Sequence, residues 1–179
     1  MSNILIISTS LRQNSNSEAL AKNFSEGAKI AKHKVEFVTL RNYHNIAFCK
    51  GCMACQKIGH CVINDDAITL AKKMLTADVI CFATPIYYYT MCGQMKTLLD
   101  RCNSLYNADY RFRRIYLLMT AAENEPYTPE KTITSLQGWV DCFEKATLAA
   151  TLFAGGVNDA GEIYNTPILT EAFNLGKNL

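Results

Sequence analysis

Residues 8–17 read Ser8-Thr9-Ser10-Leu11-Arg12-Gln13-Asn14-Ser15-Asn16-Ser17, and this polar stretch follows an apolar run, Ile4 to Ile7. A short apolar run bounded by such residues is typical of a buried strand. After the stretch, apolar residues recur at helical spacing, at Leu20, Phe24, Ala28 and Ala31. Residues 8–17 are therefore predicted to form the turn between a first strand and a first helix.

This turn is a candidate binding site for a phosphate group. Its hydroxyl and amide groups lie at a predicted helix N-terminus, and Arg12 adds a full positive charge. Ser15 followed by Glu18 also fits a capping box, in which serine is present simply because it caps the helix. The first glycine is Gly27, so the turn has neither a dinucleotide-binding nor a Walker glycine motif. We expect hydroxyl groups to hold the phosphate instead.

Length and composition limit the possible functions. A chain of 179 residues suits one domain, predicted over 1–179, which can bury roughly 70% of its unfolded surface. With 18 Lys and Arg against 16 Asp and Glu, the net charge is +2, which gives no electrostatic case for nucleic acid or an anionic membrane. We therefore expect a small-molecule partner.

The N-terminal apolar run is too short for a secretory signal, and no stretch is long enough to span a bilayer. A cytoplasmic protein is expected on this basis. Without a signal peptide, the eight cysteines are expected to be reduced, metal-bound or redox-active rather than paired in structural disulfides.

Further strands and helices alternate along the chain. Strands are predicted at 35–40, 77–83, 115–120 and 148–153, and helices near 66–75, 92–105, 129–145 and 168–175. The third strand is expected to end at Thr84-Pro85, because proline cannot continue a central strand, with a turn over 86–90. This alternation predicts a doubly wound α/β fold with a five-stranded parallel sheet in the order 2-1-3-4-5.

In that topology a ligand lies beyond the carboxyl ends of strands one and three. The turns at 8–17 and 85–89 would then face the same crevice. We expect a flavin-sized ligand there, with its phosphate at the first turn and its ring at the second.

Several other residues receive structural interpretations. Asp65 and Asp66 are expected to cap a helix, and Trp139 is expected to pack in the core. The arginines at 111, 113 and 114 are interpreted as a water-exposed strand entrance. Inert core thiols are predicted at Cys81, Cys92, Cys102 and Cys142.

The remaining cysteines, Cys49, Cys52, Cys55 and Cys61, are spaced C-x2-C-x2-C-x5-C in a predicted loop. This spacing brings four thiolates within reach of one centre. A [4Fe-4S] cluster, structural or redox-active thiols, and a zinc ion all remain open. The spacing departs from the bacterial ferredoxin run, in which the last interval is three residues and a proline follows.

Two motifs resemble the flavodoxin-like NAD(P)H-dependent FMN reductase family, and within it the branch that includes the iron-sulfur flavoproteins. Residues 10–17 resemble the family's Ser-Pro-Arg-x-x-Gly-Asn-Thr phosphate loop. Thr84-Pro85-Ile86-Tyr87 and Gln94-Met95-Lys96-x3-Asp100-Arg101 resemble its second signature, and the cysteine loop resembles the cluster motif of iron-sulfur flavoproteins. The resemblance covers nearly the whole chain and implies a three-layer flavodoxin-like fold.

By position, the resemblance implies three groups of FMN-binding residues. The phosphate would contact Ser10, Arg12, Ser15, Asn16 and Ser17. The isoalloxazine would lie beside Pro85, Ile86, Tyr87, Tyr88 and Tyr89, and against a third loop of Thr120, Ala121, Ala122 and Glu123.

The chain also departs from the family pattern. Thr9 and Ser15 stand where the family commonly has glycine, so a left-handed backbone at either position would be strained. Lys96, Asp100 and Arg101 match the second signature, but their spacing favours ion pairing or subunit packing over chemistry.

The resemblance implies an FMN-dependent oxidoreductase in which the flavin takes hydride from NAD(P)H and passes electrons to a quinone, azo or nitro compound, or flavin. No acid-base side chain is required. One alternative is an electron carrier that uses FMN and a [4Fe-4S] cluster on residues 49–61 with a ferredoxin-like partner. Another is a binding module without turnover. A homodimer or homotetramer is expected from the family.

Overall fold

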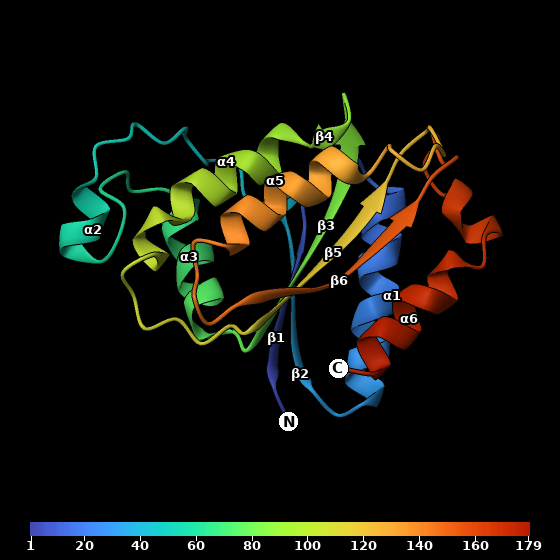
Figure 1. The fold of residues 1–179 in the computed structure, drawn as a ribbon, viewed down its shortest axis with the longest axis horizontal. Coiled ribbons are helices and arrows are strands. Elements are labelled where there is room, and N and C mark those ends of the chain that lie inside the picture. Colours follow the sequence, from blue (N-terminus) through green and yellow to red (C-terminus); the bar gives the residue numbers. More distant parts are fainter.

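One six-stranded sheet with helices on both faces forms the computed structural model, which describes residues 1–179 (Figure 1). The strands run in the order β2-β1-β3-β5-β6, all parallel, and the short β4 pairs antiparallel with β3. Without β4 this is the predicted order, so the fold class is confirmed. The strand bounds are β1 Asn3–Ser8, β2 Lys34–Thr39, β3 Val79–Tyr87, β4 Thr90–Met91, β5 Arg114–Thr120 and β6 Thr147–Ala154.

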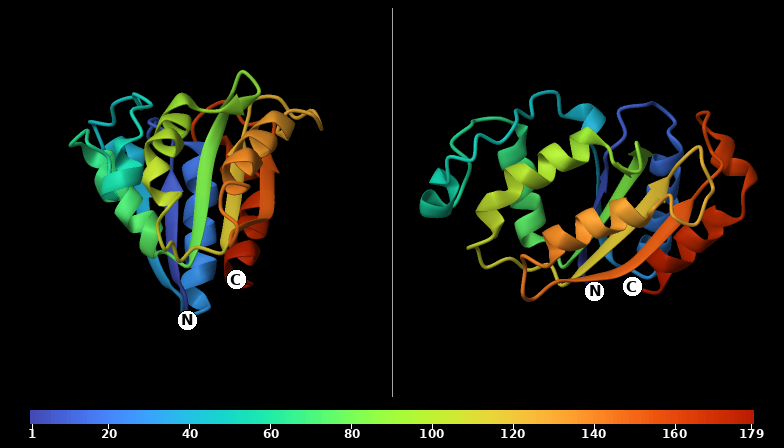
Figure 2. Two further views of the ribbon diagram at one scale, coloured as in Figure 1. Left: turned by 60° about the vertical axis from the view of Figure 1, so that its left-hand side comes forward. Right: turned by 45° about the horizontal axis from the view of Figure 1, so that its top comes forward.

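The helices form two layers (Figure 2). Helices α1 (Asn16–Ile30) and α6 (Ile168–Lys177) cover one face, and α3 (Asp66–Thr76), α4 (Gly93–Arg101) and α5 (Glu130–Val140) cover the other. Residues 49–61, which carry the four clustered cysteines, are here called the cysteine segment. The short α2 (Ala54–Ile58) lies within this segment, beside the main body of the protein. Short 3-10 helices occupy Leu40–Asn42, Cys102–Leu105 and Glu162–Asn165. No helix has the length and apolar character needed to cross a membrane.

The four central residues of β1, Ile4 to Ile7, are apolar because helices cover both faces of the sheet. Ile4 and Ile6 pack in the core beneath α1 and α6, whereas Leu5 and Ile7 pack in the core beneath α3, α4 and α5. Successive side chains of this strand thus pack in different apolar cores. This central strand sets the position of the turn that follows it.

The predicted end of the third strand at Thr84-Pro85 is wrong, because β3 continues to Tyr87 and Pro85 pairs with Thr120 of β5. The carbonyl of Ala83 accepts a hydrogen bond from Thr9 on the β1 side. Pro85 lies two residues later and faces the same side, beyond the end of β1. Its missing N–H therefore costs no ladder hydrogen bond.

The predicted turn at 86–90 is a β-hairpin that joins β3 to β4. Its two central residues, Tyr88 and Tyr89, have φ values of 50° and 62°, as the hairpin turn of this handedness requires. Glycine or asparagine is usual at such positions. The sequence pattern therefore gave no sign of this hairpin.

One further boundary differs from the predictions. The helix predicted over 129–145 ends at Val140, so Cys142 lies beyond it and is exposed. The prediction that Cys142 is a core thiol is wrong. The predictions for Cys81, Cys92 and Cys102 are confirmed, since all three are buried. Trp139 packs against the ring of Phe82, as expected.

The hairpin turn stores strain that a substitution can relieve. Tyr88 is 99% exposed, and a left-handed conformation costs an ordinary L residue about 1–2 kcal/mol. Because asparagine tolerates this conformation, Tyr88→Asn is expected to raise the free energy of unfolding by about 1 kcal/mol in urea denaturation. Tyr106→Asn is the matched control, because Tyr106 is also exposed but has a φ of −56°. Equal effects of the two substitutions would contradict the prediction.

Glu18, in the first turn of α1, is expected to make stability depend on pH. Burial opposes its ionisation, but hydrogen bonds from Arg41 and Lys22 outweigh burial and lower the pKa of Glu18 below 4.5. A depressed folded pKa stabilises the fold above the unfolded value, and the stabilisation is lost as pH falls through the folded value.

We therefore expect Glu18→Gln to lower the free energy of unfolding at pH 7 by about 1.5 kcal/mol, near the lower end for charged hydrogen bonds. The difference from the wild type should shrink as pH falls below about 4.5. Unfolding titrations from pH 7 to pH 3 measure it. Glu26→Gln, which removes an exposed ion pair on the same helix, should show little effect at any pH.

Candidate functional site

Three turns meet at the carboxyl ends of β1, β3 and β5, as the topology predicts. They line an open cavity of about 190 Å³, here called the main cavity. Its lining includes every predicted FMN-binding residue except Tyr88, Tyr89 and Glu123. Those three line an adjoining space of about 230 Å³, here called the side hollow, which shares Ile86, Ala121 and Ala122 with the main cavity. The structure thus brings all the predicted FMN-binding residues to one edge of the sheet.

The first turn is held from both ends. Thr9 donates from its backbone N–H and its hydroxyl to the carbonyl of Ala83, at 2.9 and 3.0 Å. Ser15 caps α1, and its hydroxyl accepts from the N–H of Glu18 at 3.2 Å. Between these anchors, the backbone N–H groups of Gln13, Asn14 and Ser15 have no acceptor within the chain. Free N–H groups at a helix start suit an anion.

The turn avoids the strain expected at the glycine positions of the family. Ser15 has a φ of −66°, and Thr9 is not among the residues with positive φ. The left-handed residue is Asn14, with a φ of 51°, and asparagine tolerates this conformation. The chain therefore forms the turn without either glycine.

A fourth wall of the main cavity, which the sequence analysis missed, comes from residues 157–163. Val157 and Asn158 line the cavity. Asn16 holds this segment: its side chain donates to the carbonyl of Asp159 at 2.9 Å and accepts from the N–H groups of Gly161 and Ile163. The segment directly follows β6, so the same sheet-edge argument would have located it.

Arg12 is the only charged residue that lines the main cavity. Its guanidinium donates to the carbonyl of Asn158 at 2.7 Å and lies 3.7 Å from a carboxylate oxygen of Asp159. Its side chain is half exposed, so it is free to turn toward a ligand. Arg41 lies behind the turn and donates to the carbonyl of Arg12. Asp159 and Glu18 partly offset these two arginines, so Arg12 is the cation that the lining itself offers to a ligand.

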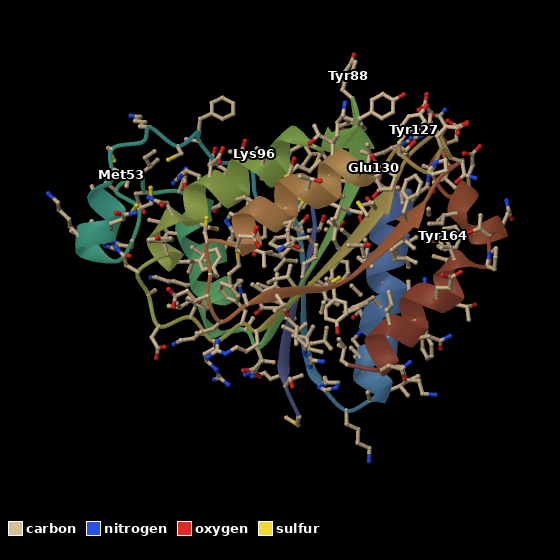
Figure 3. All side chains as sticks on the ribbon, viewed as in Figure 1. Met53, Tyr88, Lys96, Tyr127, Glu130 and Tyr164 are labelled. Atoms are coloured by element: carbon tan, nitrogen blue, oxygen red, sulfur yellow. The ribbon has the colours of Figure 1, made fainter.

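At the other end, Tyr89 joins the hairpin to the third turn. Its hydroxyl donates to Glu123 at 2.6 Å, and this hydrogen bond raises the pKa of Tyr89 to about 12. Thr128 also lines the side hollow, and its hydroxyl is buried without a partner. Buried hydroxyls without partners are uncommon. Tyr88 and Tyr127 project from this end of the molecule, far from Met53 (Figure 3).

The four clustered cysteines share a different, smaller hollow, which they line together with Arg101 and Asn103. Cys49 and Cys52 are exposed, whereas Cys55 and Cys61 are half-buried. No three cysteine, histidine or acidic side chains are placed to share a single metal ion. The structure therefore gathers the four thiols without converging them on one ion.

Asp65 caps α3 as predicted, accepting from the N–H of Ala67, and it also forms a buried ion pair with Arg101 at 2.6 Å. Burial opposes ionisation of Asp65, but hydrogen bonds from Arg101 and two backbone N–H groups hold its pKa below the usual range. Lys96 and Asp100 pair on α4 as expected. Arg111 pairs with Asp78, at the amino end of β3 and away from both cavities.

Comparison with known proteins identifies the family. Residues 2–127 match the model of the NADPH-dependent FMN reductase family. An iron-sulfur flavoprotein of Archaeoglobus fulgidus is 31% identical over 153 residues, which cover 85% of this chain and 69% of that protein. An iron-sulfur flavoprotein of Methanosarcina thermophila is 29% identical over 152 residues, 84% of this chain and 79% of that protein.

Solved structures share the fold at lower identity. An NAD(P)H:quinone oxidoreductase from Methanothermobacter marburgensis has a TM-score of 0.79 at 16% identity, covering 99% of this chain and 95% of that one. An azoreductase from Bacillus anthracis has a TM-score of 0.75 at 19% identity, with full coverage of both chains. Since the family model matches well over half of the residues, this chain belongs to the NADPH-dependent FMN reductase family and is an FMN-dependent oxidoreductase.

Proposed function

We propose that the protein holds FMN across the main cavity and the side hollow, takes hydride from NAD(P)H, and passes the electrons to a small acceptor. One observation carries this proposal. Turns from distant parts of the chain meet around one space that has Arg12 and unbonded N–H groups at one end and is largely apolar at the other. The first end suits a phosphate group, and the second end suits a planar ring attached to it.

The phosphate end is supplied by the first turn. The unbonded N–H groups of Gln13, Asn14 and Ser15 and the hydroxyls of Ser10, Ser15 and Ser17 act as donors, with Arg12 as the positive charge. Asn16 also shapes the pocket, because its side-chain oxygen and one of its two N–H groups hold residues 159–163. Its second N–H group remains available to donate to the phosphate.

The ring end is supplied by the second and third turns. Ile86 and Tyr87 give an apolar border, and the small residues Ala121 and Ala122 let a planar ring approach the backbone. The hydrogen bond between Tyr89 and Glu123 holds the two turns at a fixed spacing. FMN supplies the redox chemistry when bound, because its ring accepts hydride from a reduced nicotinamide and returns electrons to an acceptor. The side chains of the protein bind and orient the flavin.

The acceptor class is a quinone, an azo or nitro compound, or free flavin. Fold neighbours named as a quinone oxidoreductase and an azoreductase support small acceptors of this kind. A homodimer or homotetramer and a cytoplasmic location are part of the same proposal.

A second candidate function is an electron carrier that adds a [4Fe-4S] cluster on Cys49, Cys52, Cys55 and Cys61 and exchanges electrons with a ferredoxin-like partner. The shared hollow of these four cysteines favours it, as does similarity to proteins named iron-sulfur flavoproteins. Each iron of such a cluster takes one cysteine, so the thiols stand further apart than they would around a single ion. The four thiols that line one hollow supply this set of ligands.

Arg12→Ala is expected to weaken FMN binding by about 10- to 100-fold, the loss that follows from removing a charged hydrogen bond of about 1.5–3 kcal/mol. Quenching of FMN fluorescence during titration of apoprotein measures the dissociation constant. Arg111→Ala is the matched control, because it removes an exposed arginine that pairs with Asp78 away from the site. If both variants bind FMN as the wild type does, the phosphate assignment fails.

Anaerobic reduction distinguishes the two candidate functions. We expect the FMN-loaded protein to lose its flavin absorbance rapidly when NADH or NADPH is added. If only a low-potential protein donor reduces it, the reductase proposal fails and the carrier is supported. Iron and acid-labile sulfide should be measured in the same preparation, where about four of each per chain would support the cluster.

A further inference from the structure

One guanidinium closes the base of the cysteine segment. The Arg101 side chain is completely buried, and its Nη1 donates to the carbonyl of Ala47 at 2.7 Å. Both Nη atoms also bind the carboxylate of Asp65, at 2.6 and 2.8 Å. Asp65 in turn accepts from the N–H of Ala47 at 3.0 Å. Residues 47 and 65 are thereby held together, and the cysteines lie on the loop between them.

The last residue of α4 and the 3-10 helix that follows it (Cys102–Leu105) present N–H donors to two cysteine sulfurs. Nη2 of Arg101 lies 3.3 Å from Sγ of Cys61, and Nδ2 of Asn103 lies 3.5 Å from Sγ of Cys55. These are the two half-buried cysteines. Cys49 accepts only from a backbone N–H, that of Gly51, and Cys52 has no such donor.

We propose that Arg101 and Asn103 are positioning residues for the iron-sulfur centre of the cysteine segment, and that their N–H donors raise its reduction potential. The inference rests on the cluster-bearing candidate function. Reduction adds negative charge to the cluster and its sulfurs, and N–H donors stabilise that charge more strongly in the reduced state. Asp65 offsets the charge of Arg101, so the donors act mainly through directed N–H groups.

Arg101 and Asn103 differ in what else they do. Arg101 also closes the loop, and a substitution there removes structure together with the donor. The Asn103 amide bonds only to sulfur, to Cys55 and at 3.7 Å to Met53. Its replacement therefore tests the electronic effect alone.

The experiment compares wild type, Asn103→Leu and Asn103→Gln as anaerobically purified holoprotein. Leucine has nearly the shape of asparagine but no donor, whereas glutamine keeps an N–H group. Iron and sulfide content are measured first, and the midpoint potential of the cluster is then measured in a dithionite titration followed by electron paramagnetic resonance. We expect a more negative midpoint in Asn103→Leu and partial or full recovery in Asn103→Gln. Lys96→Gln, which removes an exposed ion pair on α4, should match the wild type.

An unchanged cluster midpoint in an iron-replete Asn103→Leu protein would overturn the inference and leave the cluster itself in place. A wild-type protein without iron and sulfide would remove the cluster-bearing function and this inference together. The flavin midpoint, measured in the same titration, should be equal in all variants, because the FMN site lies at the other end of α4. A flavin shift as large as the cluster shift would mean a general disturbance and would also overturn the inference.

Discussion

The pair of hydrogen bonds from Thr9 to the carbonyl of Ala83 is the constraint on which the site depends. Thr9 begins the turn after β1, and Ala83 lies near the end of the neighbouring β3, so these bonds fix two turns relative to each other. Cys92 extends the contact, because its sulfur lies 3.2 Å from the Thr9 hydroxyl and 3.4 Å from the Thr84 hydroxyl. The start of α4 is thereby joined to both strands.

The sequence predicted what depends on local pattern and on sheet topology. The apolar run from Ile4 to Ile7 predicted a strand covered on both faces, and the positions of Ser15 and Asp65 predicted helix caps. The parallel topology predicted that the turns after the strands lie at one edge of the sheet. Tertiary geometry decided the rest. Pro85 remains in β3 because β1 has already ended beside it, and Asn16 turns to residues 159–163, which are distant in sequence. Neither outcome can be read from neighbouring residues.

The cysteine segment contributes no residue to either apolar core of the fold. It lies between β2 and α3, and α2 has no buried residue. Both apolar cores are complete without it. Its attachment instead depends on polar contacts at its base, where one buried ion pair holds it against α4. A flavin-binding fold can therefore gain or lose such a segment without repacking its sheet, which separates evolution of the second site from that of the first.

Helix α4 touches both sites, with Cys92 beside the first turn and Arg101 beside the cysteines. At about 1.5 Å per residue, its nine residues span about 13 Å, a spacing set by the backbone and not by any side chain. Inserting one residue would rotate its far end by about 100° and carry the sulfur donors away from the loop. A whole-turn insertion would restore the rotation but move the far end by about 5.4 Å, so the length of this helix fixes the spacing of the two sites.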